Sequence, residues 1–333
     1  MKYVKYELSA FWRVANLIPE SDTPVPETEM RNTILAIVEM ERFPLEVATR
    51  AARIAKFYDA DLKLVLSDPT VSYLRSSFMI SVDSKQIANT VRQAQEEEIE
   101  RLVAAIEDFG VNVSTSIVQE RPASDAIVAM ALDCEPLLVV KGTVYHSPAE
   151  RATFTFNDWQ LIRKLDFPLW LAKPNHWDNS PIIVAAVDPM HPHDKKGELT
   201  QEIVDTAKSL AEKCGGKLLL LHTYERLEEV SSFAKLEFKP MKVPVRELEE
   251  KMRDEHRHQL DSLAAKNDID PSAVHLLPGR TREILPAFAR SQDADIVVMG
   301  AVARTGLVLR FIGSTAEHVL DHVPCDILVV RGG

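Results

Sequence analysis

The sequence has few cysteines and no pattern that would link them. Only three cysteines occur in 333 residues, and Cys134, Cys214 and Cys325 lie far apart. They form neither a Cys-x-x-Cys pair nor a Cys/His spacing suited to zinc, which are the patterns of disulfide frameworks and structural zinc sites. We therefore expect a reducing compartment, the cytoplasm, and no structural metal.

The sequence also lacks an excess of basic residues and a long apolar run. It carries 39 lysines and arginines against 50 aspartates and glutamates, for a formal net charge of −11. Nonspecific binding to nucleic acid or anionic membrane needs a basic face, and a membrane-spanning helix needs about 20 consecutive apolar residues. The first residues, with Lys2, Lys5 and Glu7 before a short mixed stretch, do not resemble a signal peptide. We therefore expect no nucleic-acid partner and no membrane contact.

Strand-like apolar runs alternate with long helical patterns along the chain, in two successive rounds. This order predicts an α/β fold with two tandem doubly wound domains, each a five-stranded, mostly parallel sheet with helices on both faces. The expected strands are 34–38, 62–66, 111–118, 137–140 and 168–172, then 182–187, 217–221, 274–277, 296–299 and 327–330. The expected helices are 45–58, 84–109 with Gly110 as its stop, others from about 123 and 157, then 198–213, 245–266, 282–291 and 314–322.

The two rounds superpose with one constant offset. Placing Gly142 on Gly300 is a shift of 158 residues (300 minus 142), and the same shift places residues 169–171 on 327–329 without a gap. Equal loop lengths indicate a duplication, although two generic α/β rounds could also match by chance. The expected divisions are an N-terminal extension (1–31), a first domain (32–174), a polar, proline-bounded linker (175–181) and a second domain (182–333).

The second domain carries a loop suited to a phosphate group. In an open parallel sheet, ligands bind beyond the carboxyl ends of the strands, which here directs attention to Asp188, His222 and Gly300. Gly300 ends an apolar strand, and Gly313 and Ser314 open a helix after the intervening loop. Glycine lets the backbone approach a phosphate closely, and a helix N-terminus offers unpaired amides. A capping box at the start of the same helix is the alternative explanation.

Residues 300–330 resemble the C-terminal signature of the universal stress protein family. The nucleotide-binding branch of that family has a glycine, two residues, a second glycine, nine residues, and then glycine followed by serine or threonine. Gly300, Gly313 and Ser314 match this pattern, whereas Ala303 replaces the second glycine. Alanine is restricted where the backbone needs a positive φ, so this departure weakens the match at one contact point. The resemblance extends over residues 33–331, and the chain resembles the tandem-domain, E-type members of the family.

The resemblance implies the universal stress protein fold, which is like that of the adenine nucleotide alpha hydrolases. Its strand order is 3-2-1-4-5, and the last strands of the two domains would meet at an internal pseudo-twofold axis. One chain would then equal a dimer of single-domain relatives, and homodimerisation of the whole chain stays open.

The resemblance also implies a site for ATP or another adenine nucleotide in the second domain, with or without Mg²⁺. The loop residues would line the phosphates and ribose, and Asp188 would accept hydrogen bonds from the nucleoside. A helix N-cap in the loop after the strand is the alternative role of Asp188. The implied nucleotide-binding residues are Val187, Asp188, Gly300, Ala301, Ala303, Arg304, Gly313, Ser314 and Thr315.

The first domain departs from the motif at most of these positions. Gly142 is kept, but Tyr145, Thr155 and Phe156 replace the alanine and the Gly-Ser pair of the second domain, and Glu39 replaces its aspartate. Bulky and β-branched side chains where the backbone should touch phosphate argue against a nucleotide. We therefore expect a degenerate site in the first domain.

Four histidines of the second domain are further candidates. His191 and His193 follow its first strand, where adenylyl transferases have His-x-Gly-His. The glycine is missing here and the spacing is one short, so we expect a solvated loop, with catalysis and adventitious metal binding as the alternatives. His256 and His258 are two residues apart on a helix and cannot face one ion together. We expect one of these to be packed and the other solvated.

Three hypotheses of function follow. The first is a cytoplasmic stress-response protein that binds an adenine nucleotide as a regulatory ligand and contacts an unidentified protein partner without turnover. The second is a signalling scaffold that binds no nucleotide or another small molecule, because Ala303 and the first domain depart from the motif. The third is an adenylyl transferase or weak ATPase. The sequence has none of the common phosphate-loop, dinucleotide, serine-hydrolase or zinc-protease motifs, so no catalytic or metal-binding residue is assigned.

Overall fold

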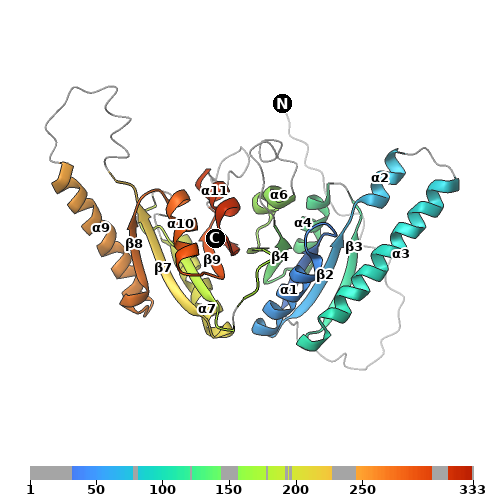
Figure 1. The fold of residues 1–333 in the computed structure, drawn as a ribbon, viewed down its shortest axis with the longest axis horizontal. Coiled ribbons are helices and arrows are strands. Elements are labelled where there is room, and N and C mark those ends of the chain that lie inside the picture. Colours follow the sequence, from blue (N-terminus) through green and yellow to red (C-terminus); the bar gives the residue numbers. More distant parts are fainter. Residues whose placement is uncertain are drawn as a thin grey trace, which may run out of the picture. The chain divides into compact units, whose positions relative to one another are not determined.

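Strands and helices alternate along the chain in the order that the sequence predicts (Figure 1). The computed structural model describes residues 32–77, 82–120, 122–143, 157–177, 179–191, 194, 197–226, 245–301 and 314–331. The predicted N-terminal extension, residues 1–31, lies outside the described residues.

The first domain contains five strands and their covering helices. The strands are β1 (Thr33–Val38), β2 (Asp61–Ser67), β3 (Val113–Val118), β4 (Leu138–Gly142) and β5 (Leu169–Ala172). The described helices are α1 (Pro44–Tyr58), α2 (Thr70–Ser77), α3 (Val82–Ala105), the 3-10 turn η1 (Glu107–Phe109), α4 (Ala123–Cys134) and α6 (Asn157–Lys164).

The second domain repeats this order. Its strands are β6 (Ile182–Ala186), β7 (Lys217–Tyr224), β8 (Val274–Pro278), β9 (Ile296–Gly300) and β10 (Asp326–Val330). The described helices are α7 (Glu198–Cys214), α9 (Val245–Lys266), the 3-10 turn η2 (Pro271–Ala273), α10 (Thr281–Ser291) and α11 (Ser314–His322).

The predicted helix over residues 84–109 is wrong at its end, and α2 was not predicted. The α-helix ends at Ala105, and η1 is a separate turn closed by Gly110, whose φ of 67° suits glycine. The eight-residue helix α2 is too short to show a clear helical period. Its start is marked by Asp68, whose Oδ1 accepts from the amide and hydroxyl of Thr70 at 3.0 and 2.6 Å.

The strands of both domains join in one ten-stranded sheet. Its order is β3-β2-β1-β4-β5-β10-β9-β6-β7-β8, so each domain has the implied order 3-2-1-4-5. Neighbouring strands within a domain are parallel, whereas β5 and β10 pair antiparallel, with Trp170 opposite Leu328. This antiparallel pairing of equivalent strands confirms the expected internal pseudo-twofold relation.

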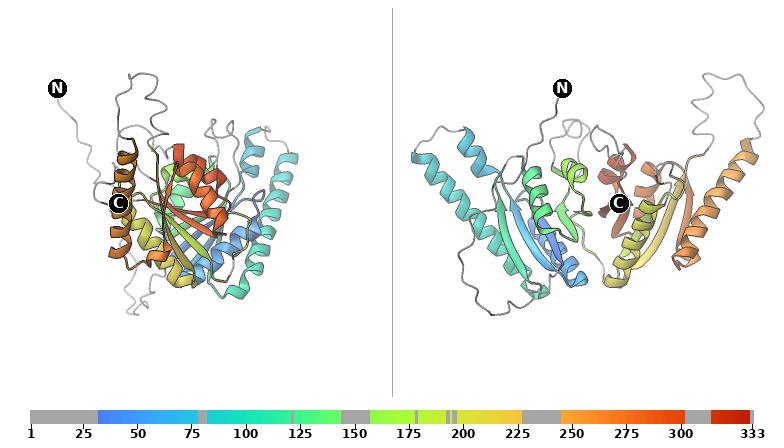
Figure 2. Two further views of the ribbon diagram at one scale, coloured as in Figure 1. Left: turned by 60° about the vertical axis from the view of Figure 1, so that its left-hand side comes forward. Right: turned by 180° about the vertical axis from the view of Figure 1, so that it is seen from behind.

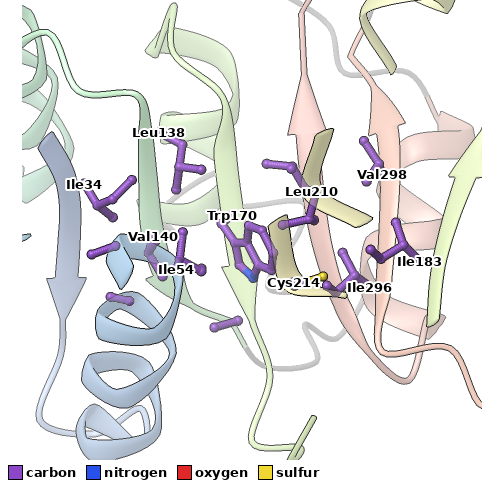
Figure 3. Close-up of a cluster of buried hydrophobic side chains, with 14 of the residues drawn as sticks. Ile34, Ile54, Leu138, Val140, Trp170, Ile183, Leu210, Cys214, Ile296 and Val298 are labelled. Atoms are coloured by element: carbon purple, nitrogen blue, oxygen red, sulfur yellow. The ribbon is translucent and has the colours of Figure 1, made fainter. Parts of the chain in front are cut away.

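Helices lie on both faces of the sheet (Figure 2), and the hydrophobic core forms two layers, one on each face. Buried side chains of α1, α3, α7 and α9 belong to one layer, and those of α4, α6, α10 and α11 to the other. Figure 3 shows Trp170 between Val140 of the first domain and Ile296 of the second. Because Trp170 is completely buried, separating the domains would expose a large apolar side chain.

A buried carboxylate lies where the two domains meet. Asp326, the first residue of β10, accepts hydrogen bonds from Nε1 of Trp170 at 2.7 Å and from the amide of Lys173 at 2.9 Å. It also accepts from the guanidinium group of Arg50 on α1. Burial is the largest influence on this ion pair; it raises the pKa of Asp326 and lowers that of Arg50, while each partner's charge opposes the shift of the other.

The polar segment that joins the domains is held by the same arginine. Arg50 donates to the carbonyl of Asn175, and its guanidinium carbon lies 4.0 Å from the ring centroid of Trp177. The side-chain amide Nδ2 of Asn175 in turn donates to the carbonyl of Pro324 in the second domain. The first domain, the linker and the second domain are therefore connected through one set of contacts, which runs from the buried Asp326 to the exposed Asn175.

Asp326→Asn is expected to lower the free energy of unfolding by about 3–5 kcal/mol, because the buried Arg50 would lose its carboxylate. Urea denaturation monitored by circular dichroism measures the change. Asp261→Asn is the control, because Asp261 is 56% exposed and lies 3.5 Å from Arg257; such surface pairs contribute about 0–1 kcal/mol. Similar losses in the two variants would contradict a central role of Asp326.

Candidate functional site

The carboxyl ends of three neighbouring strands bring the predicted second-domain residues to one edge of the sheet. Strand β6 pairs in parallel with β9 on one side and β7 on the other. Asp188 follows β6, Gly300 ends β9, and His222 lies near the end of β7. The three residues therefore share the edge at which open parallel sheets bind their ligands.

Gly300 packs against the first turn of α7. A Cβ atom placed on it would lie 2.8 Å from a methyl carbon of Leu199, closer than real contacts allow. The next residue, Ala301, donates its amide to the carbonyl of Val330 at 2.9 Å. The glycine thus lets the side chain of Leu199 pack closely on the end of β9, and the amide of Ala301 continues the sheet.

The backbone of Val187 is also engaged within the protein. Its amide donates to the carbonyl of Leu221 at 2.9 Å, and its carbonyl lies 3.0 Å from Nδ1 of His222. Its side chain is 6% exposed and belongs to the core. Val187 therefore packs at the carboxyl ends of the strands, and its apolar side chain offers no hydrogen bond to a ligand.

Asp188 keeps a half-exposed carboxylate at this edge. Its side chain is 50% exposed, and Oδ1 accepts one long hydrogen bond, 3.3 Å, from the amide of Met190. The first turn of α7 is instead capped by Asp194, which accepts from the amides of Leu199 and Thr200 at 3.2 and 2.8 Å. Helix capping therefore does not account for Asp188, which corrects the alternative considered from the sequence.

Part of the predicted loop lies outside the described residues, namely Ala303, Arg304 and Gly313. The helix that follows begins at Ser314, as predicted, and Thr315 belongs to its first turn. His193 also lies outside the described residues, while the amide of His191 donates to the carbonyl of Asp188 at 3.1 Å. The described residues contain no group of three or more His, Cys, Asp or Glu side chains that could hold a metal ion.

A pair of histidines, one buried and one half-buried, lies beside Asp188. Nε2 of His222 is 2.8 Å from Nδ1 of His256 on α9, and Nδ1 of His222 is 4.0 Å from Oδ1 of Asp188. The ring of Tyr224 stacks on His256, with 5.2 Å between centroids. Burial is the largest influence on both imidazoles and lowers their pKa, while the charge of Asp188 opposes this.

The expectation for the two α9 histidines is confirmed, but the pairing itself was not predicted. His256 is half-buried and His258 is exposed. His222 and His256 are 34 residues apart, so their contact depends on how α9 packs on β7. The available signal was that His256 precedes the buried Leu260 by one helical turn and therefore shares its face.

The equivalent edge of the first domain is filled by charged side chains of the protein itself. Lys141 on β4 is completely buried, with Nζ 2.7 Å from Oε2 of Glu39, and the same oxygen lies 3.1 Å from Nε of Arg42. A Cβ atom on Gly142 would lie 3.1 Å from the carbonyl oxygen of Arg42. Glu39 is thus held by two cations, whereas Asp188 of the second domain stays half exposed. Tyr145, Thr155 and Phe156 lie outside the described residues.

Comparison with known proteins places both halves of the chain in one family. The model of the universal stress protein family matches residues 30–173 and 182–331. A Universal stress protein E homolog from Haemophilus influenzae is 26% identical over 303 residues, 90% of this chain and 96% of that relative. Universal stress protein E from Escherichia coli is 29% identical over 223 residues, 67% of this chain and 69% of that relative.

Solved structures share the two-domain fold. A putative universal stress protein from Pseudomonas aeruginosa has a TM-score of 0.63 and 23% identity, covering 90% of this chain and 93% of its own. A universal stress protein from Archaeoglobus fulgidus has a TM-score of 0.63 and 15% identity, covering 91% and 97%. No helix in the described part of the chain has both the length and the apolar character needed to cross a bilayer.

Gly300→Ala is expected to lower the free energy of unfolding by about 1–3 kcal/mol, because the new methyl group would overlap Leu199 and overpacking costs this much. Leu199→Ala removes the overlapping atoms, so adding Gly300→Ala to that variant is expected to cost clearly less. A double-mutant cycle by urea denaturation measures the coupling between the two positions. Equal costs in both backgrounds would mean that something other than Leu199 requires the glycine.

Proposed function

The chain belongs to the universal stress protein family, with two family domains in tandem as in its E-type relatives, and from this premise we propose that its second domain binds an adenine nucleotide as a regulatory ligand. The family supports a role in the stress response. That the ligand is a nucleotide is the more specific part of the proposal. It rests on the chemistry at the carboxyl ends of the strands in the second domain.

The difference between the two domain edges is the observation that carries the proposal. Glu39 is engaged by Lys141 and Arg42, so its carboxylate is neutralised by the protein. Asp188, at the matching position, is 50% exposed and accepts one long hydrogen bond. An ionised carboxylate only accepts hydrogen bonds, which suits the hydroxyl groups of a ribose. The second domain thus retains a polar group of the kind a nucleoside requires.

We further propose that the nucleotide acts by occupancy and is not turned over. This rests on the sequence, which has none of the common motifs of phosphoryl transfer or hydrolysis. A ligand that binds one arrangement of the loops better than another shifts the protein toward that arrangement. Such a shift would alter the surface offered to a protein partner.

A scaffold that binds no nucleotide is the second candidate, and specific backbone contacts favour it. The amide of Ala301 is bonded to Val330, and both polar backbone groups of Val187 have partners within the protein. Ala303 also departs from the family's glycine pattern. A nucleotide would therefore depend on Asp188 and on the loop that precedes α11.

Titration with ATP, ADP and AMP, with and without Mg²⁺, tests the proposal by isothermal titration calorimetry. A tenfold excess of ligand over its Kd should also raise the free energy of unfolding by about 1.4 kcal/mol. Asp188→Asn is expected to weaken binding by about tenfold or more, because a hydrogen bond to a charged group contributes roughly 1.5–3 kcal/mol and about 1.4 kcal/mol is a factor of ten. The matched first-domain variant, Glu39→Gln, is expected to keep the wild-type Kd.

The outcomes separate the candidates. Loss of binding in Glu39→Gln with full binding in Asp188→Asn would move the site to the first domain. Absence of binding by all three nucleotides would favour the scaffold.

No phosphate release from ATP above the rate in protein-free buffer is expected. A continuous phosphate assay with Mg²⁺ measures it over hours at protein concentrations well above the Kd. Release that disappears in Asp188→Asn would contradict the regulatory role and make the protein an ATPase. Release that persists unchanged in this variant would be traced to a contaminating enzyme.

A further inference from the structure

His222 occupies a strand position that the first domain fills with leucine. The registers of the two sheets, with Gly142 superposed on Gly300, place His222 where the first domain has Leu66. Leu66 is 0% exposed and His222 is 1% exposed. A leucine therefore satisfies the packing of this position, and the fold itself does not require an imidazole there.

The hydrogen bonds of the histidine pair determine where its protons lie. The carbonyl of Val187 can only accept, so Nδ1 of His222, 3.0 Å away, carries a proton and donates to it. Nε2 of the neutral His222 is then an acceptor, and Nδ1 of His256, at 2.8 Å, donates to it. Nε2 of His256 carries no proton in this arrangement and is the place where the next proton binds.

The pair can take up one proton without losing a contact, but not two. A proton on Nε2 of His256 leaves both hydrogen bonds intact and turns the bond between the rings into a charge-assisted one. A second proton, on Nε2 of His222, would remove the acceptor of that bond and place two positive charges side by side. The pair therefore carries a charge of 0 or +1.

The groups around the pair come from three elements. Asp188, after β6, acts on both histidines, Glu255 on α9 acts on His256, and Tyr224 on β7 stacks on the ring of His256. Burial lowers the pKa of both imidazoles and the two carboxylates oppose it. The pair is therefore harder to protonate than free imidazoles, and a lower pH or a nearby anion favours its protonated form.

We propose that the His222–His256 pair takes up a proton when the second domain binds a nucleotide, so that mild acidification strengthens nucleotide binding. This inference rests on the proposed function. The negative charge of Asp188 disfavours an anionic ligand at the same edge of the sheet, as does the net charge of −11 on the chain. The positive charge of a protonated pair offsets the charge of Asp188, whose Oδ1 lies 4.0 Å from Nδ1 of His222 and whose charge also acts on His256. By thermodynamic linkage, a bound ligand favours protonation of the pair by the same free energy by which protonation favours ligand binding.

In this arrangement His222 and His256 are positioning residues. They hold the ends of β6 and β7 against α9 and set the local charge, while Asp188 meets the ligand. A purely structural pair would affect stability, but it would not couple proton uptake to ligand binding.

The test is calorimetric titration with ADP at pH 8.0 and pH 6.0, in buffers of different ionisation enthalpy, which reports proton uptake directly. The variants are His222→Leu, which installs the first-domain residue, and His256→Gln, which keeps a donor but cannot titrate. The wild type is expected to gain two- to fivefold in affinity at pH 6.0 relative to either variant. His258→Gln, on the exposed side of the same helix, is the control and should behave as wild type.

Two further measurements exclude other sources of pH dependence. Ionisation of the ADP phosphates is the same for every variant, so it cancels in the comparison, and adenosine, which has no phosphate, should show no difference between wild type and His256→Gln. Histidine proton resonances of the ligand-free protein should show the pair gaining one proton, and that titration should be missing in His222→Leu.

Each outcome decides the matter. Equal pH dependence in the wild type and both variants would overturn the inference and leave the proposed function standing. Absence of ADP binding at both pH values would overturn the proposed function and this inference with it. A pH dependence abolished by EDTA would assign the pair to metal binding, which would also overturn the inference.

Discussion

The antiparallel pairing of β5 with β10 is the constraint on which the rest of the structure depends. It turns two five-stranded sheets into one sheet of ten and leaves neither inner edge open. Asp326, the residue before the paired segment of β10, accepts from a tryptophan, a backbone amide and Arg50, so the domains share hydrogen bonds as well as apolar area. A buried carboxylate is tolerated only with such partners, which makes one relative arrangement of the domains strongly preferred over others.

Because the junction is fixed, the two domains can diverge at the carboxyl ends of their strands. In the first domain, the carboxyl ends of the strands are occupied by the ion pair of the buried Lys141 with Glu39, which needs no ligand. The second domain has kept a half-exposed aspartate and has placed a histidine pair next to it. Because both edges rest on the same core layers, these changes alter local charge without altering the fold. Duplication thus supplied one domain for support and left the other to carry the candidate site.

Local patterns predicted the fold well because they depend on neighbours in sequence. Apolar runs and the constant offset between Gly142 and Gly300 located the strands, and the family resemblance implied their order in the sheet. Helix α2 was not predicted because eight residues show too little periodicity. Site chemistry depends on distant residues. Lys141 meets Glu39 across 102 positions, and His222 meets His256 across 34. Neither contact follows from strand and helix assignment, because both depend on which helix or loop packs over each strand end.

The three pairs of ionisable side chains, Arg50 with Asp326, Lys141 with Glu39 and His222 with His256, differ in the charges that they combine. Arg50 with Asp326, and Lys141 with Glu39, each combine a cation with a carboxylate, so the two charges of each pair offset one another. The imidazoles of His222 and His256 carry no fixed charge, and burial keeps them neutral until a proton or an anion alters the balance. A buried group whose charge can change costs stability in one of its states, and a leucine would serve the packing equally well. The position of the histidine pair beside the half-exposed Asp188 therefore points to ligand binding, rather than to folding, as the reason for the pair.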